Sequence, residues 1–151
     1  MLRTRLNDAL KQAMKAREER AVSTLRLILA ALKDRDICAR GKGNDDGIGE
    51  DEILAMLQTM IKQRKEAIQL YEQGGRLELA QQEQDEIRII ESFMPRQLSE
   101  DETKSAITAA IQELGCCGVK DMGRTMALLK QRYAGQMDFA RASGMVRQHL
   151  S

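Results

Sequence analysis

Apolar residues recur at three- and four-residue intervals along most of the chain, and this spacing is typical of amphipathic helices. The first such stretch contains Leu2, Leu6, Ala9, Ala13 and Met14. The second contains Leu25, Ile28, Leu29 and Leu32. Ser23 or Thr24 is the expected N-cap of the second helix, which should end before the loop "GKGNDDGIG". The pattern therefore predicts two helices before this loop.

A third and a fourth helix are predicted between this loop and Pro95, which is the single proline of the chain. The third begins near Glu50 and Asp51, whose charges suit a helix N-terminus, and it ends at Gly74–Gly75. The fourth should continue to Met94, because the residue before a proline is pushed out of the helical region. Cations early in the third helix and carboxylates late in the fourth predict ion pairs between two antiparallel helices.

Three shorter helices are predicted after Pro95. Ser99 and Glu102 have the spacing of a capping box, and Gly115 should end the helix that follows. Asp121 and Asp138 are the expected caps of the two remaining helices. No segment shows a strand pattern. We therefore predict an all-α protein with a multi-helix N-terminal domain, residues 1–94, and a small three-helix bundle, residues 95–151, with the joint at Pro95 and Leu98.

The two predicted domains differ in charge. The whole chain has a net charge of +1, so no bulk attraction to nucleic acid or membranes is expected. Residues 1–94 contain 16 Lys+Arg and 17 Asp+Glu, whereas residues 96–151 contain 8 and 6. From Thr103 onward, seven basic residues stand against Glu113, Asp121 and Asp138. Any affinity for a polyanion is therefore expected in the C-terminal bundle.

Part of this positive charge should lie on one face of the helix after Asp121. At 100° per residue, the apolar side of that helix comprises Met122, Met126, Leu129 and Tyr133. Lys120 and Arg124 fall on the opposite side. Such a strip can neutralise backbone phosphates, but every surface helix also has a solvated polar face, and the pattern is compatible with both interpretations. No aromatic residue is interleaved with the cations, so phosphate binding would select folded RNA by its shape.

The sequence contains no recognisable motif for catalysis or cofactor binding. His149, the only histidine, is close to the C-terminus, where a surface or packing role is expected. Cys116 and Cys117 are adjacent and lack the spacing of a zinc or thioredoxin-like site. Cys38 is expected to be a small packing residue at a helix end. Phosphate-binding glycine loops and calcium-loop spacing are missing. We therefore predict no catalytic residue, no metal and no cofactor.

Targeting signals are also missing from the pattern. The first residues, "MLRTRLNDALKQAM", show neither a continuous apolar run nor a small-residue cleavage site. No stretch approaches the roughly 20 apolar residues of a membrane span. Three cysteines cannot all pair within one chain. These features predict a cytoplasmic protein with reduced thiols and without membrane association, and they do not indicate an oligomeric state.

Three segments resemble the YqeY (GatB/YqeY) family of small bacterial proteins: "TLRLILAALKDRDI", "MIKQRKEAIQLYEQGGRLELAQQEQDEIRIIESFMPRQLSEDE" and "DMGRTMALLK". The resemblance extends over essentially the whole chain and implies a helical domain followed by a three-helix domain. The C-terminal half of the family is similar to the tail of the B subunit of the tRNA-dependent aspartyl/glutamyl amidotransferase, which helps to hold the tRNA body. The matching positions are Pro95, Leu98, Asp121, Met122, Gly123, Arg124, Met126, Gly135 and Asp138.

The resemblance implies a tRNA-associated accessory protein without a catalytic site of its own. Its candidate RNA-binding residues are Lys120, Gly123, Arg124, Lys130, Arg132, Arg141 and Arg147. Many relatives carry an arginine where this chain has Gln136, so one cation is missing at that turn. One alternative is a component of a carbon–nitrogen ligase with glutamine as amido donor, acting with an amidotransferase or aminoacyl-tRNA synthetase partner. Another is a protein-interaction scaffold that docks through the apolar stripe of its first helix.

Overall fold

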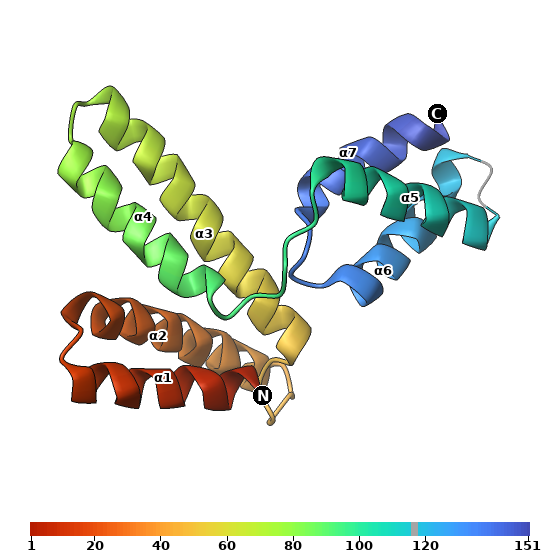
Figure 1. Cartoon of the computed structure of the whole chain (residues 1–151). Coiled ribbons are helices and arrows are strands. Elements are labelled where there is room, and N and C mark those ends of the chain that lie inside the picture. Colours follow the sequence, from red (N-terminus) through yellow and green to blue (C-terminus); the bar gives the residue numbers. More distant parts are fainter. Residues whose placement is uncertain (116–117) are drawn as a thin grey trace. The chain divides into compact units, whose positions relative to one another are not determined.

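The apolar helix faces gather into two separate cores in the computed structural model of the chain, which describes residues 1–115 and 118–151. One core lies in Met1–Met94 and the other in Pro95–Ser151. No strand occurs in the described ranges, and the expected all-α fold is confirmed. The expectation for Cys116 and Cys117 falls on residues outside those ranges. The elements are α1 (Leu2–Ala16), α2 (Glu19–Gly41), α3 (Glu50–Gln73), α4 (Leu77–Glu91), α5 (Glu100–Leu114), the short 3-10 helix η1 (Val119–Asp121), α6 (Met122–Tyr133) and α7 (Phe139–Leu150) (Figure 1).

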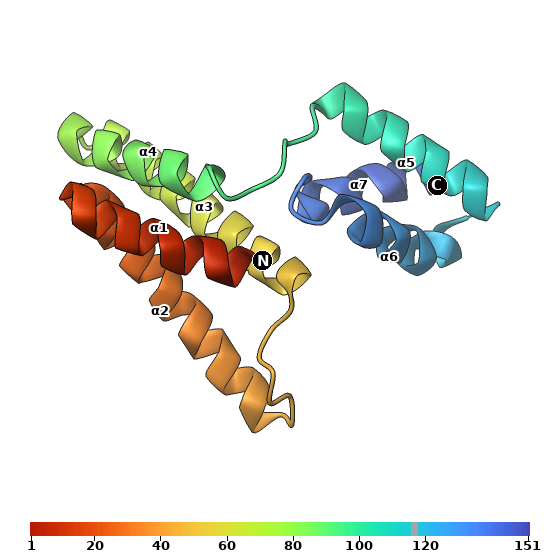
Figure 2. The ribbon, with the colours of Figure 1, turned by 60° about the horizontal axis from the view of Figure 1, so that its bottom comes forward.

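The first unit consists of two helical hairpins, α1–α2 and α3–α4, which pack on each other (Figures 1 and 2). Their apolar stripes meet in a core in which Leu6, Ile28, Leu57 and Ile90 are all fully buried. Burial of each such side chain contributes roughly 1.5–3 kcal/mol. Most of the predicted stripe residues lie in this core, whereas Met14 is 45% exposed.

An ion pair between the half-buried Arg3 and the buried Asp36 holds the loop between α2 and α3. Asp36 accepts hydrogen bonds from Arg3 Nη1 at 2.6 Å and from Arg3 Nη2 at 2.7 Å. The same Arg3 Nη2 donates to the Ile48 carbonyl at 2.7 Å, and the Ile48 N–H donates to Asp36 at 3.0 Å. The arginine lowers the pKa of Asp36 to about 2. Gly47 lies against this carboxylate with φ +82°, a conformation that favours glycine. The sequence pattern did not reveal this cluster.

The predicted ion pairing between α3 and α4 is present. Arg64 on α3 lies 3.0 Å from a carboxylate oxygen of Glu86 and 4.0 Å from one of Glu83. Burial and the neighbouring Glu86 raise the pKa of Glu83. Asp85, in contrast, pairs with Arg20 on α2, so the α4 carboxylates connect both hairpins of the first unit.

Three local expectations were wrong. α2 begins at Glu19, directly after a tight reversal in which Arg17 is left-handed with φ 57°, so Ser23 and Thr24 lie inside the helix. Their hydroxyls donate to backbone carbonyls four residues earlier instead of capping the helix. α4 ends at Glu91 rather than Met94, because turns occupy the residues before Pro95. Cys38 is exposed within α2 and is not a packing residue.

The second unit is a three-helix bundle in which most helix termini follow the predicted signals, whereas Asp121 stands at the N-cap of α6 without a capping hydrogen bond to its side chain. Ser99 and Glu102 form the capping box of α5, Gly115 ends α5 with φ 65°, and Asp138 caps α7 through the Ala140 N–H at 3.0 Å. Ile107, Leu129 and Val146 are among the side chains of its core.

Leu98 is anchored inside the second unit. Its N–H donates to the Gln136 carbonyl at 2.8 Å, and its half-buried side chain packs against the bundle core. The Gln97 amide donates to the carbonyls of Pro95 and Gly135. The turn that contains Gln136 therefore has a structural role, because its backbone holds the segment that begins at Pro95.

Candidate nucleic-acid interface

The sequence-predicted RNA-binding residues are all exposed on the second unit. Lys120 belongs to η1, and the others belong to α6 (Gly123, Arg124, Lys130, Arg132) and α7 (Arg141, Arg147). On α6 the apolar side packs as expected, with Leu129 fully buried and Met122, Met126 and Tyr133 partly buried. The cations therefore face solvent for the reason predicted, because the helix turns its apolar stripe to the core.

The first turn of α6 combines a small residue with an ion pair. A Cβ atom added to Gly123 would meet nothing within 4 Å, so the space beside this position is open. The Arg124 guanidinium donates to the Asp121 carboxylate at 2.8 Å. A phosphate near this helix N-terminus would benefit from the helix dipole but would have to compete with Asp121 for Arg124.

Two further arginines are held by carboxylates of α5. Arg132 lies 2.6 Å from Glu113 and Arg141 lies 3.2 Å from Glu100. The hydrogen bond from Arg132 lowers the pKa of Glu113. Glu100 and Glu113 stand at opposite ends of α5, about 20 Å apart along its axis, so Arg132 and Arg141 are not brought together. Exposed pairs of this kind add little to stability, but they cancel charge locally.

The remaining cations carry the positive charge that is available to a ligand. Lys120, Lys130 and Arg147 are exposed and form no ion pair with another described residue. At 100° per residue, Lys130 and Arg132 lie on opposite flanks of α6. The predicted residues thus form a dispersed set around the bundle rather than one dense patch.

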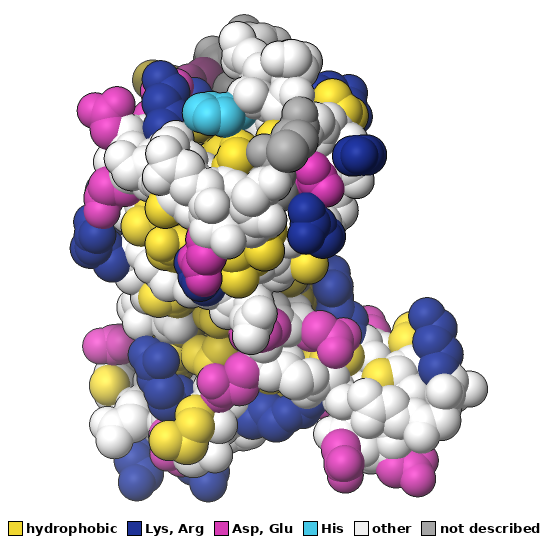
Figure 3. All heavy atoms as spheres, turned by 90° about the vertical axis from the view of Figure 1, so that its right-hand side faces the viewer, with side chains coloured by type: hydrophobic (Ala, Val, Ile, Leu, Met, Phe, Trp, Pro, Cys, Tyr) yellow, Lys and Arg dark blue, Asp and Glu magenta, His cyan; other side chains and the backbone are white. Residues whose placement is uncertain are grey.

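His149, the single histidine of the chain, lies at the surface of the second unit. It is exposed near the end of α7, and it is the cyan side chain in Figure 3. Side chains of both charges surround this region in that view, without a continuous basic area. The expected surface position of His149 is confirmed. No group of three His, Cys, Asp or Glu side chains suited to a metal occurs in residues 1–115 and 118–151.

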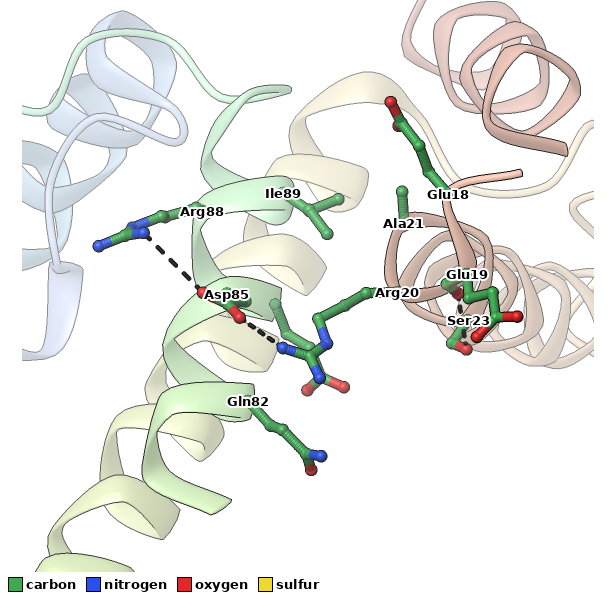
Figure 4. A pocket seen from close by; sticks show the side chains of 10 residues that line it. Glu18, Glu19, Arg20, Ala21, Ser23, Gln82, Asp85, Arg88 and Ile89 are labelled. Carbon is green, nitrogen blue, oxygen red and sulfur yellow. Dashed lines mark hydrogen bonds and ion pairs between the residues drawn. The ribbon is translucent and has the colours of Figure 1, made fainter. Parts of the chain in front are cut away.

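A concavity in the first unit was not foreseen from the sequence. It is a groove of about 830 Å³ between the start of α2 and α4, shown in Figure 4. Arg20 reaches across it to Asp85, and Arg88 lies 3.8 Å from the same carboxylate. Hydrogen bonds from Gln81 and Arg20 lower the pKa of Asp85. Because these charged side chains pair with one another, we interpret the Arg20–Asp85 ion pair as a structural link between the two hairpins.

Comparison with known proteins shows which family the sequence matches. A model of Yqey-like proteins matches residues 3–150. The mitochondrial protein "Altered inheritance of mitochondria protein 41" is 34% identical in Saccharomyces cerevisiae strain YJM789, 33% in Eremothecium gossypii and 32% in Lachancea thermotolerans, each over 89 residues. These matches include 59% of this chain and 46% of each relative, so the chain matches less than half of their length.

Across the described residues, no helix is long and apolar enough to span a membrane.

Proposed function

Because the chain belongs to the Yqey-like family, we propose that it is a tRNA-associated accessory protein whose C-terminal bundle binds folded RNA through phosphate contacts. The observation that carries the proposal is the set of exposed cations on the bundle, Lys120, Lys130 and Arg147, which make no ion pair with a described residue. The resemblance of this half to the amidotransferase B-subunit tail supports RNA as the polyanion.

The arrangement favours backbone contacts over base recognition. The cations lie on helix surfaces without an exposed aromatic platform among them, whereas single-stranded bases are bound by stacking on aromatic side chains. Double-stranded regions of RNA present phosphates and 2′-hydroxyls to such surfaces. Arg124, Arg132 and Arg141 contribute less, because each would first have to leave its carboxylate.

The experiment is a titration of labelled bulk tRNA with the full chain at about 50 mM and 200 mM salt. Replacing Lys120→Gln together with Lys130→Gln removes two phosphate contacts, which should lower the slope of log affinity against log salt by about 1.4–1.8. At about 150 mM salt the same change should weaken binding about 15- to 30-fold.

A matched control removes the same charge elsewhere. Lys62 and Lys65 on α3 are also exposed and form no ion pair with a described residue, so Lys62→Gln with Lys65→Gln should leave the affinity within about twofold if binding is local. Equal losses in both double variants would reduce the effect to net charge. Wild-type protein that does not bind at the lower salt would refute the proposal.

A further inference from the structure

The near-neutral charge of the first unit conceals a separation between its two hairpins. Residues 1–42, which include α1 and α2, contain 11 Lys+Arg and 5 Asp+Glu. Residues 43–94, which include α3 and α4, contain 5 and 12. The α1–α2 hairpin therefore has a net side-chain charge of +6 and the rest of the unit −7. The most positive segment of the chain lies outside the bundle.

Two contacts show which sides of α1 and α2 face each other. Arg3 near the start of α1 pairs with Asp36 near the end of α2. At the other end of the hairpin, Arg26 Nη2 lies 3.8 Å from the Met14 sulfur. The two helices are therefore antiparallel neighbours along most of α1, and the flank of α2 that carries Arg26 is the flank nearest α1.

Helical geometry then places five cations on the outer side of this hairpin. Successive residues are separated by 100°, so residues seven positions apart along α2 stay on the flank of Arg26. On α1, the positions opposite the buried Leu6 turn away from the core. We call this set the hairpin basic face: Lys11 and Lys15 of α1, and Arg26, Lys33 and Arg40 of α2.

The hairpin basic face differs from the bundle in how its charges are compensated. All five side chains are exposed, and none forms an ion pair with another described residue. Arg26, Lys33 and Arg40 rise about 10 Å from one to the next and form a row about 21 Å long. A straight row of exposed cations without a close ion-pair partner complements an elongated polyanion such as a nucleic-acid backbone, in which every contact releases counterions.

A membrane surface fits this face less well. Helices that lie on membranes need a continuous apolar face beside the cations. Here the apolar stripes of α1 and α2 are buried in the core, with Leu6 and Ile28 at 0% exposure. The exposed Leu27 and Ile37 lie ten positions apart on α2, about 15 Å along the axis, and do not make such a face.

We propose that the hairpin basic face is a second RNA-binding surface, which contacts the phosphate backbone independently of the bundle. The choice of RNA as the polyanion rests on the proposed function, whereas the location rests on the charges of the first unit. The acidic α3–α4 hairpin repels phosphates and restricts RNA to the α1–α2 side of this unit.

The test uses the full chain and three double variants of equal charge. Lys11→Gln with Lys33→Gln alters the hairpin basic face, Lys120→Gln with Lys130→Gln alters the bundle, and Lys62→Gln with Lys65→Gln is the shared control. With labelled tRNA at about 150 mM salt, the hairpin variant should bind about 15- to 30-fold more weakly and lose about 1.4–1.8 of the salt slope. Melting curves by circular dichroism verify that each variant folds.

The outcomes separate the two proposals. A weakened hairpin variant with an unchanged bundle variant supports the hairpin basic face and contradicts the proposed bundle site. The opposite result contradicts the inference and leaves the proposed function intact. A second measurement uses vesicles with and without phosphatidylserine. If the wild-type protein binds the anionic vesicles, and the hairpin variant loses this binding but keeps its tRNA affinity, the inference is overturned in favour of a lipid surface.

Discussion

The α1–α2 hairpin and the C-terminal bundle use their cations differently. In the bundle, Arg124, Arg132 and Arg141 each pair with a nearby carboxylate. In the hairpin, Lys11, Lys15 and Lys33 have no such partner among the described residues. The comparison teaches that the net charge of a segment is a poor measure of the charge that a ligand meets. What counts is which cations remain uncompensated at the surface after folding.

A second comparison concerns two carboxylates whose pKa an arginine lowers to about 2: Asp36 in the first unit and Glu102 in the second. The Asp36 side chain is only 12% exposed, whereas that of Glu102 is 39% exposed. Solvent screens an exposed pair, so the same chemistry should stabilise the first unit far more than the second. Substitutions in each unit can test this difference.

Gly47→Ala should have the largest effect. The added Cβ would lie 2.4 Å from an Asp36 carboxylate oxygen, and the φ of +82° is unfavourable for alanine. Displacing the buried Asp36 carboxylate from its ion pair and straining the backbone should lower the free energy of unfolding of the first unit by about 3 kcal/mol. Urea titration followed by tyrosine fluorescence in a Tyr133→Phe background reports this unit, because Tyr71 is then the only tyrosine.

Gly144→Ala is the matched control in the second unit. Gly144 lies within α7, and a Cβ there would meet nothing within 4 Å. Alanine is the better helix former, so the second unit should gain about 0.5–1 kcal/mol. Equal destabilisation by both substitutions would show that the contacts of Gly47 have no special role.

Acid should destabilise the first unit through Asp36. The folded-state pKa of about 2 lies below the ordinary value of 3.8, so the stabilisation is present above about pH 4 and is lost as the pH falls towards 2. The loss should be about 2 kcal/mol, and Asp36→Asn should remove both this pH dependence and a similar amount of stability at pH 7. Urea titrations at several pH values measure it, and an unchanged acid dependence in the variant would contradict the assignment.

Ser99→Ala should have the smallest of the three destabilising effects, after Gly47→Ala and the protonation of Asp36. Its hydroxyl accepts the Glu102 N–H at 3.1 Å within the capping box of α5. Loss of a cap costs about 1 kcal/mol, and here it should lower the stability of the second unit. Tyrosine fluorescence in a Tyr71→Phe background measures this, because Tyr133 is then the reporter. Ser99→Asp should restore most of the stability, and a cap-independent loss would appear as failure of this rescue.

The helices could be predicted because their signals are local. The capping box of Ser99 and Glu102, the left-handed Gly115 and the 3.6-residue stripes all act within a few residues. The Arg3–Asp36–Ile48 cluster could not be predicted, since its members are far apart in sequence and carry no motif. Ser23 was wrongly predicted to cap α2, because a serine whose hydroxyl donates to the carbonyl four residues earlier cannot be told from a cap by its local sequence.

The candidate surface could be predicted only in part. The exposure of Arg124 and Lys130 follows from helix periodicity, whereas the pairing of Arg132 with Glu113 depends on how α5 packs beside α6. Averaging the charge over residues 1–94 concealed the positive hairpin, which becomes apparent once α1 and α2 are seen to form one layer (Figure 1).

We expect RNA to bind where cations remain uncompensated at the surface. The most direct test is to map the backbone amide shifts of the ¹⁵N-labelled full chain when tRNA is added at about 50 mM salt. We predict shifts or broadening along the outer side of α1 and α2 and around Lys120 and Lys130, which fade at about 200 mM salt, with α3 and α4 unaffected beyond uniform line broadening. Perturbations centred on α3–α4, or on the paired arginines alone with a silent hairpin, would contradict the account.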